Sequence, residues 1–269
     1  MLISLLRNAF GAKRPHKELA LKQEIARQRG AYLELLKDCL IGRIYEDRPF
    51  QDPNFQPEWR EMGLDWPTQA HSMIGNRRMV NLWQLCEDVI VKEVPGDFIE
   101  TGVWRGGACI FMRAILKTYG VDDRIVWVSD SFEGLPLPDE EKYPKDRGYG
   151  QHTLPYLAVS LEEVEKNFRN YGLLDDQVRF LKGWFKDTLY AAPIERLAVL
   201  RLDGDMYEST MDALRALYHK LSPGGYLVVD DFFLESCRAA IRDFRKEHGI
   251  EEAMQRIDDN AVFWQKRHA

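Results

Sequence analysis

The sequence contains few cysteines, and none of the four lies at the spacing of a disulfide framework or a metal site. Cys39, Cys86, Cys109 and Cys237 are far apart, without a CxxC pair or a cysteine–histidine cluster. This pattern argues against a thiolate metal centre and a small disulfide-bonded scaffold. Single scattered cysteines are typical of reduced thiols, and we therefore expect a cytoplasmic protein.

Long hydrophobic runs and an excess of positive charge are absent as well. No apolar stretch approaches the ~20 residues of a membrane-spanning helix, and the start, MLISLLRNAF, lacks the features of a secretory signal peptide. The net charge of −6 argues against nucleic acid as the main partner. We therefore expect neither a membrane partner nor a nucleic-acid partner.

The composition is that of an ordinary globular protein, with 45% hydrophobic and 30% charged residues in a chain of 269. Helical periodicity over 17–42 and 72–94 precedes a boundary near Pro95, after which the pattern changes. We predict that residues 1–95 form a helical N-terminal extension and lid. Residues 96–269 are predicted to form the main domain.

In the main domain, strand and helix patterns alternate, which is typical of a parallel sheet covered by helices. Five such units are followed by a hairpin with its turn at Asp259-Asn260. A Rossmann domain continues with a parallel sixth strand, whereas a terminal antiparallel hairpin matches the class I fold of S-adenosylmethionine (SAM)-dependent methyltransferases. We therefore predict an α/β fold with a seven-stranded, mainly parallel sheet. The predicted parallel strands are DFIETGV, RIVWVSDS, QVRFLKGW, LAVLRLD and GYLVVDD.

The first predicted strand runs into IETGVWRGGA, a glycine-rich turn that opens a helix. Gly102, Gly106 and Gly107 allow a tight turn and a close approach of the backbone to a ligand. Their spacing is not the GxGxxG of dinucleotide-binding proteins. Glu100 would repel a pyrophosphate but can accept hydrogen bonds from an ammonium group, such as that of SAM. The turn therefore favours SAM over a dinucleotide, although a purely structural role explains the glycines equally well.

The next two strand ends carry further candidates for cofactor binding. Asp130 ends the second strand, where a carboxylate can accept hydrogen bonds from both ribose hydroxyls; its alternative role is to cap a turn or helix. Gly183 and Trp184 end the third strand. Trp184 can face an adenine ring, or it can simply pack in the core.

Two pairs of aspartates end the fourth and fifth strands, in VLRLDGDMYEST and GYLVVDDFF. These strands lie side by side in a doubly wound sheet, so Asp203, Asp205, Asp230 and Asp231 are expected to meet at one edge. Like charges at close range disfavour ionisation, and shared protons or a bound cation relieve that cost. The alternative is that these aspartates are helix caps and turn residues.

A bound cation would also explain a reaction. Carboxylates without histidine or cysteine suit Mg²⁺, with Mn²⁺ or Ca²⁺ as alternatives. A divalent ion lowers the pKa of a coordinated hydroxyl, and a nearby carboxylate can accept its proton during attack on a methyl group. This division needs three acids as metal ligands and one as the base.

Motifs along nearly the whole chain resemble the macrocin O-methyltransferase family, whose members include macrolide and aminocoumarin deoxysugar O-methyltransferases. The resemblance implies a SAM- and Mg²⁺-dependent enzyme that methylates a sugar hydroxyl of a natural product, often as a dimer or larger homo-oligomer. The motifs that carry it are YLELLKDCLIGRIYED, SMIGNRRMVNL, GDFIETGVWRGGA, VSDSFEGLP, LRLDGDMYESTMDAL, GGYLVVDDF, CRAAIRDFRKEHGI and QRIDDNAVFW.

The resemblance also assigns roles to residues. It implies that Asp203, Asp230 and Asp231 are metal ligands and that Asp205 is the general base. It further implies that Glu100, Gly102 and the SDS at 129–131, with Asp130 and Ser131, belong to the cofactor site.

The sequence leaves the acceptor open. The segments 50–68 and 136–155 are predicted to define the acceptor side, and the acceptor is expected to be a small glycosylated molecule. The alternatives are a catechol-type phenol O-methyltransferase and a non-catalytic SAM-binding protein. An NAD-linked oxidoreductase is disfavoured by the glycine spacing and the terminal hairpin.

Overall fold

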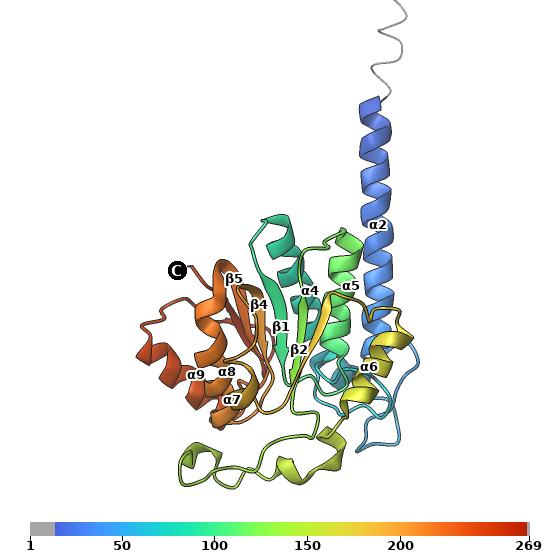
Figure 1. The fold of residues 1–269 in the computed structure, drawn as a ribbon. Coiled ribbons are helices and arrows are strands. Elements are labelled where there is room, and N and C mark those ends of the chain that lie inside the picture. Colours follow the sequence, from blue (N-terminus) through green and yellow to red (C-terminus); the bar gives the residue numbers. More distant parts are fainter. Residues whose placement is uncertain (1–13, 268–269) are drawn as a thin grey trace, which may run out of the picture.

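A seven-stranded sheet forms the centre of the computed structural model, which describes residues 14–267 (Figure 1). The strand order is β3-β2-β1-β4-β5-β7-β6. The first five strands pair in parallel, while β7 runs antiparallel to both β5 and β6. The predicted fold, with its terminal antiparallel hairpin, is therefore confirmed. The strands are β1 Asp97–Thr101, β2 Val126–Asp130, β3 Val178–Lys182, β4 Leu197–Leu202, β5 Leu221–Val229, β6 Gln255–Arg256 and β7 Val262–Gln265.

Helices cover both faces of this sheet (Figure 1). Neighbouring residues of a strand point to opposite faces, so Phe98 packs in one core cluster and Ile99 in the other. Strands β2 and β4 are buried along nearly their whole length and are largely apolar, whereas the edge strand β3 exposes Arg179 and Lys182. The helices are α2 Arg14–Leu40, α3 Pro57–Met62, α4 Gly75–Val91, α5 Gly107–Tyr119, α6 Leu161–Asn170, α7 Phe185–Thr188, α8 Tyr207–Leu217 and α9 Glu235–Glu247.

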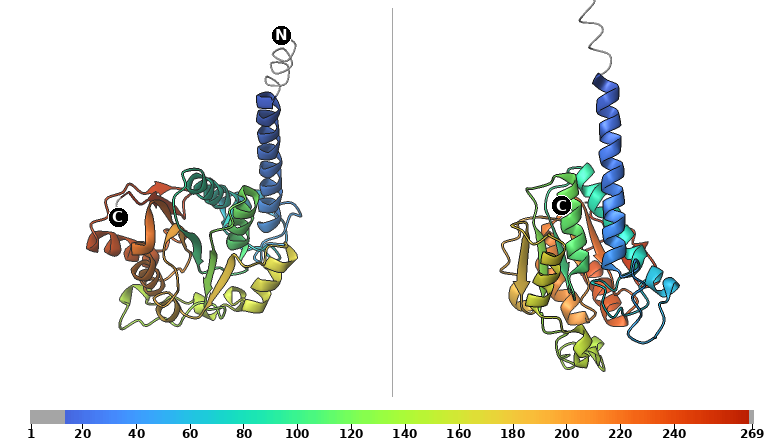
Figure 2. Two further views of the ribbon diagram at one scale, coloured as in Figure 1. Left: turned by 45° about the horizontal axis from the view of Figure 1, so that its top comes forward. Right: turned by 90° about the vertical axis from the view of Figure 1, so that its right-hand side faces the viewer.

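The N-terminal extension packs against the main domain over part of its length. Leu33 and Leu40 in the last turns of α2, and Met79 of α4, belong to the same buried cluster as Phe98 of the sheet. The first half of α2 projects away from the rest of the chain (Figure 2). The apolar start of the chain lies outside the described residues, and the division at residue 95 stays a prediction.

The long segment between β2 and α6 contains three 3₁₀ turns, Pro144–Asp146, Gln151–Thr153 and Pro155–Leu157. It runs along the edge of the sheet where the parallel strands end (Figure 1). Neither these turns nor the short helices α3 and α7 were predicted, because a few residues are too short to show a helical period. Within the described part of the chain, no helix is long and apolar enough to cross a membrane.

Candidate active site

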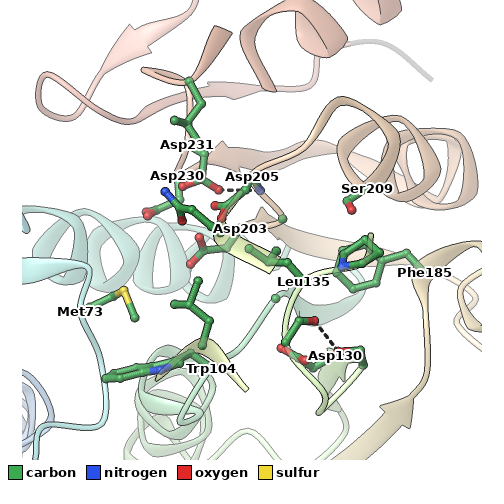
Figure 3. A pocket seen from close by; sticks show the side chains of 18 of the residues that line it. Met73, Trp104, Asp130, Leu135, Phe185, Asp203, Asp205, Ser209, Asp230 and Asp231 are labelled. Carbon is green, nitrogen blue, oxygen red and sulfur yellow. Dashed lines mark hydrogen bonds between the residues drawn. The ribbon is translucent and has the colours of Figure 1, made fainter. Parts of the chain in front are cut away.

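A cavity of about 620 Å³ lies at the carboxyl-terminal edge of the parallel strands. Its walls come from the segments after β1, β2, β4 and β5, from the extension and from the long loop. This is where open α/β sheets bind their ligands. Figure 3 shows Asp203, Asp205, Asp230 and Asp231 gathered on one side of the cavity, with Asp130 on another.

Asp203 is held where the ends of β1 and β4 approach each other closely. Its backbone N–H donates to the carbonyl oxygen of Thr101 at 2.9 Å. Gly102, next to Thr101, has a φ of +88°, and a Cβ atom there would lie 1.7 Å from the carbonyl oxygen of Asp203. Only glycine tolerates both conditions. The predicted glycine turn therefore sets the distance between the two strand ends.

Asp205 occupies a backbone conformation that residues with side chains rarely adopt, with a φ of +58°. Its N–H donates to Asp231 Oδ2 at 3.1 Å, and its carbonyl accepts from the Ser236 hydroxyl at 3.0 Å. Contacts from α9 and from the end of β5 thus hold the strained residue in place. Backbone strain of this kind is concentrated at functional sites.

Three of the four predicted aspartates form a group that can hold a cation. Asp203, Asp205 and Asp231 each offer an oxygen, and these oxygens lie within 4.8 Å of one another. Asp203 retains 24% of its side-chain surface, which faces the cavity, so an ion can enter there. A group made of carboxylates alone suits a hard divalent cation such as Mg²⁺. The residues present therefore fit the predicted metal.

Asp230 lies in the same cluster but is engaged differently. One of its oxygens is 2.5 Å from Nη1 of Arg78, and the other accepts a hydrogen bond from Nη2 of Arg201. Both carboxylate oxygens therefore have a guanidinium partner. Its predicted role as a metal ligand stays a prediction, and the geometry places Asp205 in the group instead.

Arg201 is the centre of the cluster and was missed by the sequence analysis. It is 1% exposed and lies in β4, in register with Glu100 of the neighbouring strand. Its Nη1 atom is 2.5 Å from Glu100 Oε1 and 2.6 Å from Asp203 Oδ2. The sequence did contain a sign of this role, namely an arginine inside the apolar predicted strand LAVLRLD. Arginine is rarely buried without a partner, so an acidic neighbour could have been predicted.

Arg78 connects the cluster to the terminal hairpin. Its Nε atom donates to Asp258 Oδ2 at 2.9 Å. The other oxygen of Asp258 accepts the backbone N–H groups of Asn260 and Ala261 at 2.8 and 2.9 Å. The predicted turn is therefore held by an acid that also pairs with the site. The spacing of Arg78 and Asp258 in the sequence does not predict their contact.

The cluster carries an excess of buried negative charge. Burial raises the pKa of Asp205 to about 6. Burial, together with neighbouring carboxylates, raises the pKa values of Asp203 and Asp231 well above the ordinary range. Burial by itself lowers the pKa of Arg201, but the surrounding carboxylates outweigh it and raise that pKa. Bound protons or a cation must offset the excess. Two guanidiniums, of Arg78 and Arg201, face six carboxyl groups, those of Glu100, Asp203, Asp205, Asp230, Asp231 and Asp258.

Four of the six residues predicted to bind the cofactor line the cavity, namely Gly102, Asp130, Ser131 and Trp184. Asp130 accepts the N–H of Phe132 at one oxygen and that of Val103 at the other, both at 2.7 Å. Each carboxylate oxygen can accept more than one hydrogen bond, so this capping role leaves room for a ligand.

The other two, Glu100 and Gly183, are not part of the cavity wall in the described structure. Glu100 is 2% exposed and accepts hydrogen bonds from Arg201 and, at 3.0 Å, from the thiol of Cys109. The N–H of Gly183 donates to the carbonyl of Asp130 at 2.9 Å. Both residues support the site from behind its surface, and their cofactor roles stay predictions.

Aromatic and apolar side chains form one wall of the cavity, to which the extension and the turn after β1 both contribute. Trp66 is stacked on Tyr156 with ring centroids 5.2 Å apart, and Trp104 lies 5.4 Å from the same ring. Leu64 and Met73 complete this side of the cavity. Figure 3 shows Met73 there. Leu64 and Trp66 belong to the predicted acceptor segment 50–68, and Tyr156 supports Trp66 from just outside the predicted segment 136–155. The residues of that second segment that line the cavity are Pro136, Leu137 and Gln151.

The model of the Macrocin-O-methyltransferase (TylF) family matches residues 45–266. The chain belongs to the macrocin O-methyltransferase family. It is 51% identical over 243 residues to demethyldecarbamoylnovobiocin O-methyltransferase of Streptomyces niveus, covering 87% of this chain and 93% of that protein. It is 49% identical over 243 residues to mycinamicin III 3''-O-methyltransferase of Micromonospora griseorubida, covering 87% and 96%.

Solved structures of methyltransferases resemble this member of the macrocin O-methyltransferase family in their fold. The structure of the O-methyltransferase NovP matches with a TM-score of 0.87 at 51% identity, covering 89% of this chain and all of that one. A calicheamicin methyltransferase, 17% identical and with a TM-score of 0.57, covers 90% of this chain and 91% of its own, and shows the shared fold alone. The predicted family is confirmed, and the chain is an O-methyltransferase with the fold of SAM-dependent methyltransferases.

Proposed function

We propose that the protein methylates a sugar hydroxyl of a glycosylated natural product. It would use SAM as the methyl donor and Mg²⁺ as the divalent cation. The observation that carries the proposal is the carboxylate group of Asp203, Asp205 and Asp231, which opens into the cavity. The names of the relatives support the acceptor class, because they give demethyldecarbamoylnovobiocin, mycinamicin III and a rhamnosyl-tetracenomycin C as the methylated molecules.

The residues divide the work of the reaction between them. Asp203 and Asp231 would hold the cation with the predicted ligand Asp230 beside them, and Asp130 and Trp184 would hold the cofactor. When bound, the cation would lower the pKa of an acceptor hydroxyl. Asp205 would accept the hydroxyl proton while the new oxygen–carbon bond forms and the sulfur–carbon bond of SAM breaks. The products are the methyl ether and S-adenosylhomocysteine.

A methyl-transfer screen with labelled SAM tests the acceptor class. Glycosylated metabolites with free vicinal hydroxyls are expected to accept label, because the aromatic wall can pack against the apolar part of such a molecule. Simple catechols serve as the comparison, since they also present two adjacent oxygens. Transfer to catechols alone would replace the sugar assignment with the phenol alternative.

The cation site is tested by titrating Mg²⁺ into the protein by calorimetry. Asp203→Asn removes one charged ligand and is expected to weaken Mg²⁺ binding by about tenfold or more. Asp212→Asn is the matched control, because Asp212 lines the same cavity but lies outside the carboxylate group. An Asp203→Asn variant with wild-type affinity would remove Asp203 from the ligand set.

We also propose that the chain forms a homo-oligomer through helix α2. Leu21, Ile25, Tyr32 and Leu35 are 60%, 50%, 42% and 53% exposed. Their spacing of four, seven and three residues places them along one stripe of the helix, as in a coiled-coil seam. The last turns of α2 bury Leu33 and Leu40 on a different face, roughly 100° around the helix from this stripe. A second copy of the helix is the occupant that would cover such a stripe.

Light scattering after size-exclusion chromatography tests this assembly. The double variant Leu21→Glu with Ile25→Glu is expected to run as a monomer at concentrations where the wild type is a dimer or larger. Leu19→Glu is the control, since Leu19 is 56% exposed but lies off the stripe. A wild-type monomer, or an equal effect of the control, would contradict the assignment.

The proposal includes a cytoplasmic location. All four cysteines are free thiols, and those at positions 86, 109 and 237 are buried. Free thiols of this kind are typical of a reducing compartment.

A further inference from the structure

The long loop between β2 and α6 contacts the predicted base directly. The hydroxyl of Tyr149 donates a hydrogen bond to Asp205 Oδ2 at 2.6 Å. A hydrogen bond to an ionised carboxylate is short and stronger than one between neutral groups. Tyr149 belongs to the segment 136–155, which was predicted to define the acceptor side. No sequence motif predicted its contact with Asp205.

Asp146 anchors the same loop to helix α8. Asp146 is 1% exposed, and its two oxygens accept the backbone N–H groups of Tyr207 and Glu208 at 2.6 and 3.0 Å. Those N–H groups belong to the first turn of α8, where they lack partners inside the helix. Met206, at the N-cap position, contributes no side-chain cap. The loop therefore supplies the cap that the helix lacks.

A short turn connects the anchor with the tyrosine. The N–H of Tyr149 donates to the carbonyl of Asp146 at 3.1 Å. Gly148, between them, has a φ of +76°, a conformation that glycine adopts without strain. Docking of Asp146 on α8 therefore fixes where the hydroxyl of Tyr149 lies.

The backbone of Asp205 is already fixed by Asp231 and Ser236, as described above. Its side chain faces the cavity and contacts two neighbours, the carboxyl group of Asp231 and the hydroxyl of Tyr149. Of these two, Tyr149 is the contact that the long loop supplies, and its hydrogen bond favours one orientation of the carboxylate. Orientation of a base relative to the hydroxyl it deprotonates contributes strongly to rate.

We propose that Asp146 and Tyr149 form a latch, in which Asp146 docks the loop on α8 and Tyr149 positions the carboxylate of Asp205. Tyr149 is then a positioning residue that acts through the base. This inference rests on the proposed function, since it takes Asp205 as the proton acceptor. It adds a task for the long loop, which both lines the cavity and orients the base.

Steady-state kinetics of Tyr149→Phe test the positioning role. Phenylalanine keeps the ring and removes the hydroxyl, so kcat is expected to fall by about tenfold or more. The KM for the acceptor and the calorimetric Kd for SAM are expected to stay within about twofold, because only the orientation of the base changes. Tyr143→Phe is the control, since Tyr143 lies on the same loop and packs against Tyr207 rather than contacting Asp205.

An unchanged kcat in Tyr149→Phe would overturn the positioning role. A higher kcat would overturn it as well, because the hydrogen bond would then hold the base in an inhibited state.

Hydrogen exchange tests the anchor without any acceptor. In the wild type, the amides of Tyr207 and Glu208 are expected to be protected, and Asp146→Asn is expected to speed their exchange and that of residues 144–150. Absence of protection in the wild type would overturn the latch. A protected wild type that methylates no acceptor would instead contradict the proposed function, so the two failures are distinguishable.

Discussion

Replacing Asp205 with asparagine is expected to lower kcat by roughly 10²–10⁴-fold, the usual contribution of a general base. Asparagine has nearly the same shape as aspartate, and its side-chain oxygen can still accept a hydrogen bond, but it cannot take up the proton of the acceptor hydroxyl. SAM affinity is expected to remain at the wild-type level, because Asp130 and Trp184 lie on other parts of the cavity wall. Initial rates at saturating substrates and calorimetry with SAM measure both quantities.

The same variant separates two roles for Asp205. If it is the base, Mg²⁺ affinity in Asp205→Asn stays near the wild-type value while turnover collapses. If Asp205 is instead a ligand of the cation, Mg²⁺ affinity falls as it does in Asp203→Asn. This role has to be tested because Asp205 lies in one carboxylate group with Asp203 and Asp231. Wild-type turnover would exclude Asp205 from the chemistry.

Replacing Arg201 with methionine is expected to cost about 3–5 kcal/mol of the free energy of unfolding. The arginine is 1% exposed and contacts Glu100, Asp203 and Asp230. Methionine fills similar space but leaves Glu100 buried without its cationic partner and leaves Asp230 with Arg78 alone, and an unpaired buried charge is costly. Urea denaturation at neutral pH measures the loss.

Arg215→Met is the matched control for Arg201→Met. Arg215 is on the exposed side of α8, with 46% of its side chain accessible and Glu247 at 4.0 Å. An exposed pair of this kind contributes at most about 1 kcal/mol. Equal losses in the two variants would show that the buried network does not hold the strand ends together.

The architecture was predictable because it rests on local patterns. Helix α5 begins at the glycine-rich turn that was predicted to open a helix, and it is flanked by Gly106 and Gly120, which both adopt left-handed conformations. The inner strands β1, β2 and β4 are buried along nearly their whole length, and β2 and β4 therefore appear as largely apolar runs. The meeting of Asp203, Asp205, Asp230 and Asp231 followed from strand order alone.

The pairing within the site was not predictable in the same way. Arg201, Arg78 and Asp258 come from β4, α4 and the hairpin, and their contacts depend on how those elements pack. The direction in which Glu100 points, toward Arg201 rather than the cavity, depends on the same packing. Tyr149 lies in a loop that Asp146 docks on Tyr207 of α8, 61 residues further along the chain. Sequence spacing carries no information about such contacts.

The most direct test of the carboxylate group as a cation site for methyl transfer is the rate of label transfer from SAM to a glycosylated acceptor with and without EDTA. The account predicts that EDTA abolishes transfer, that Mg²⁺ in excess restores it, and that Asp203→Asn needs more Mg²⁺ for the same rate. Full activity in EDTA would contradict it, and would leave the buried carboxylates to share protons instead of a cation.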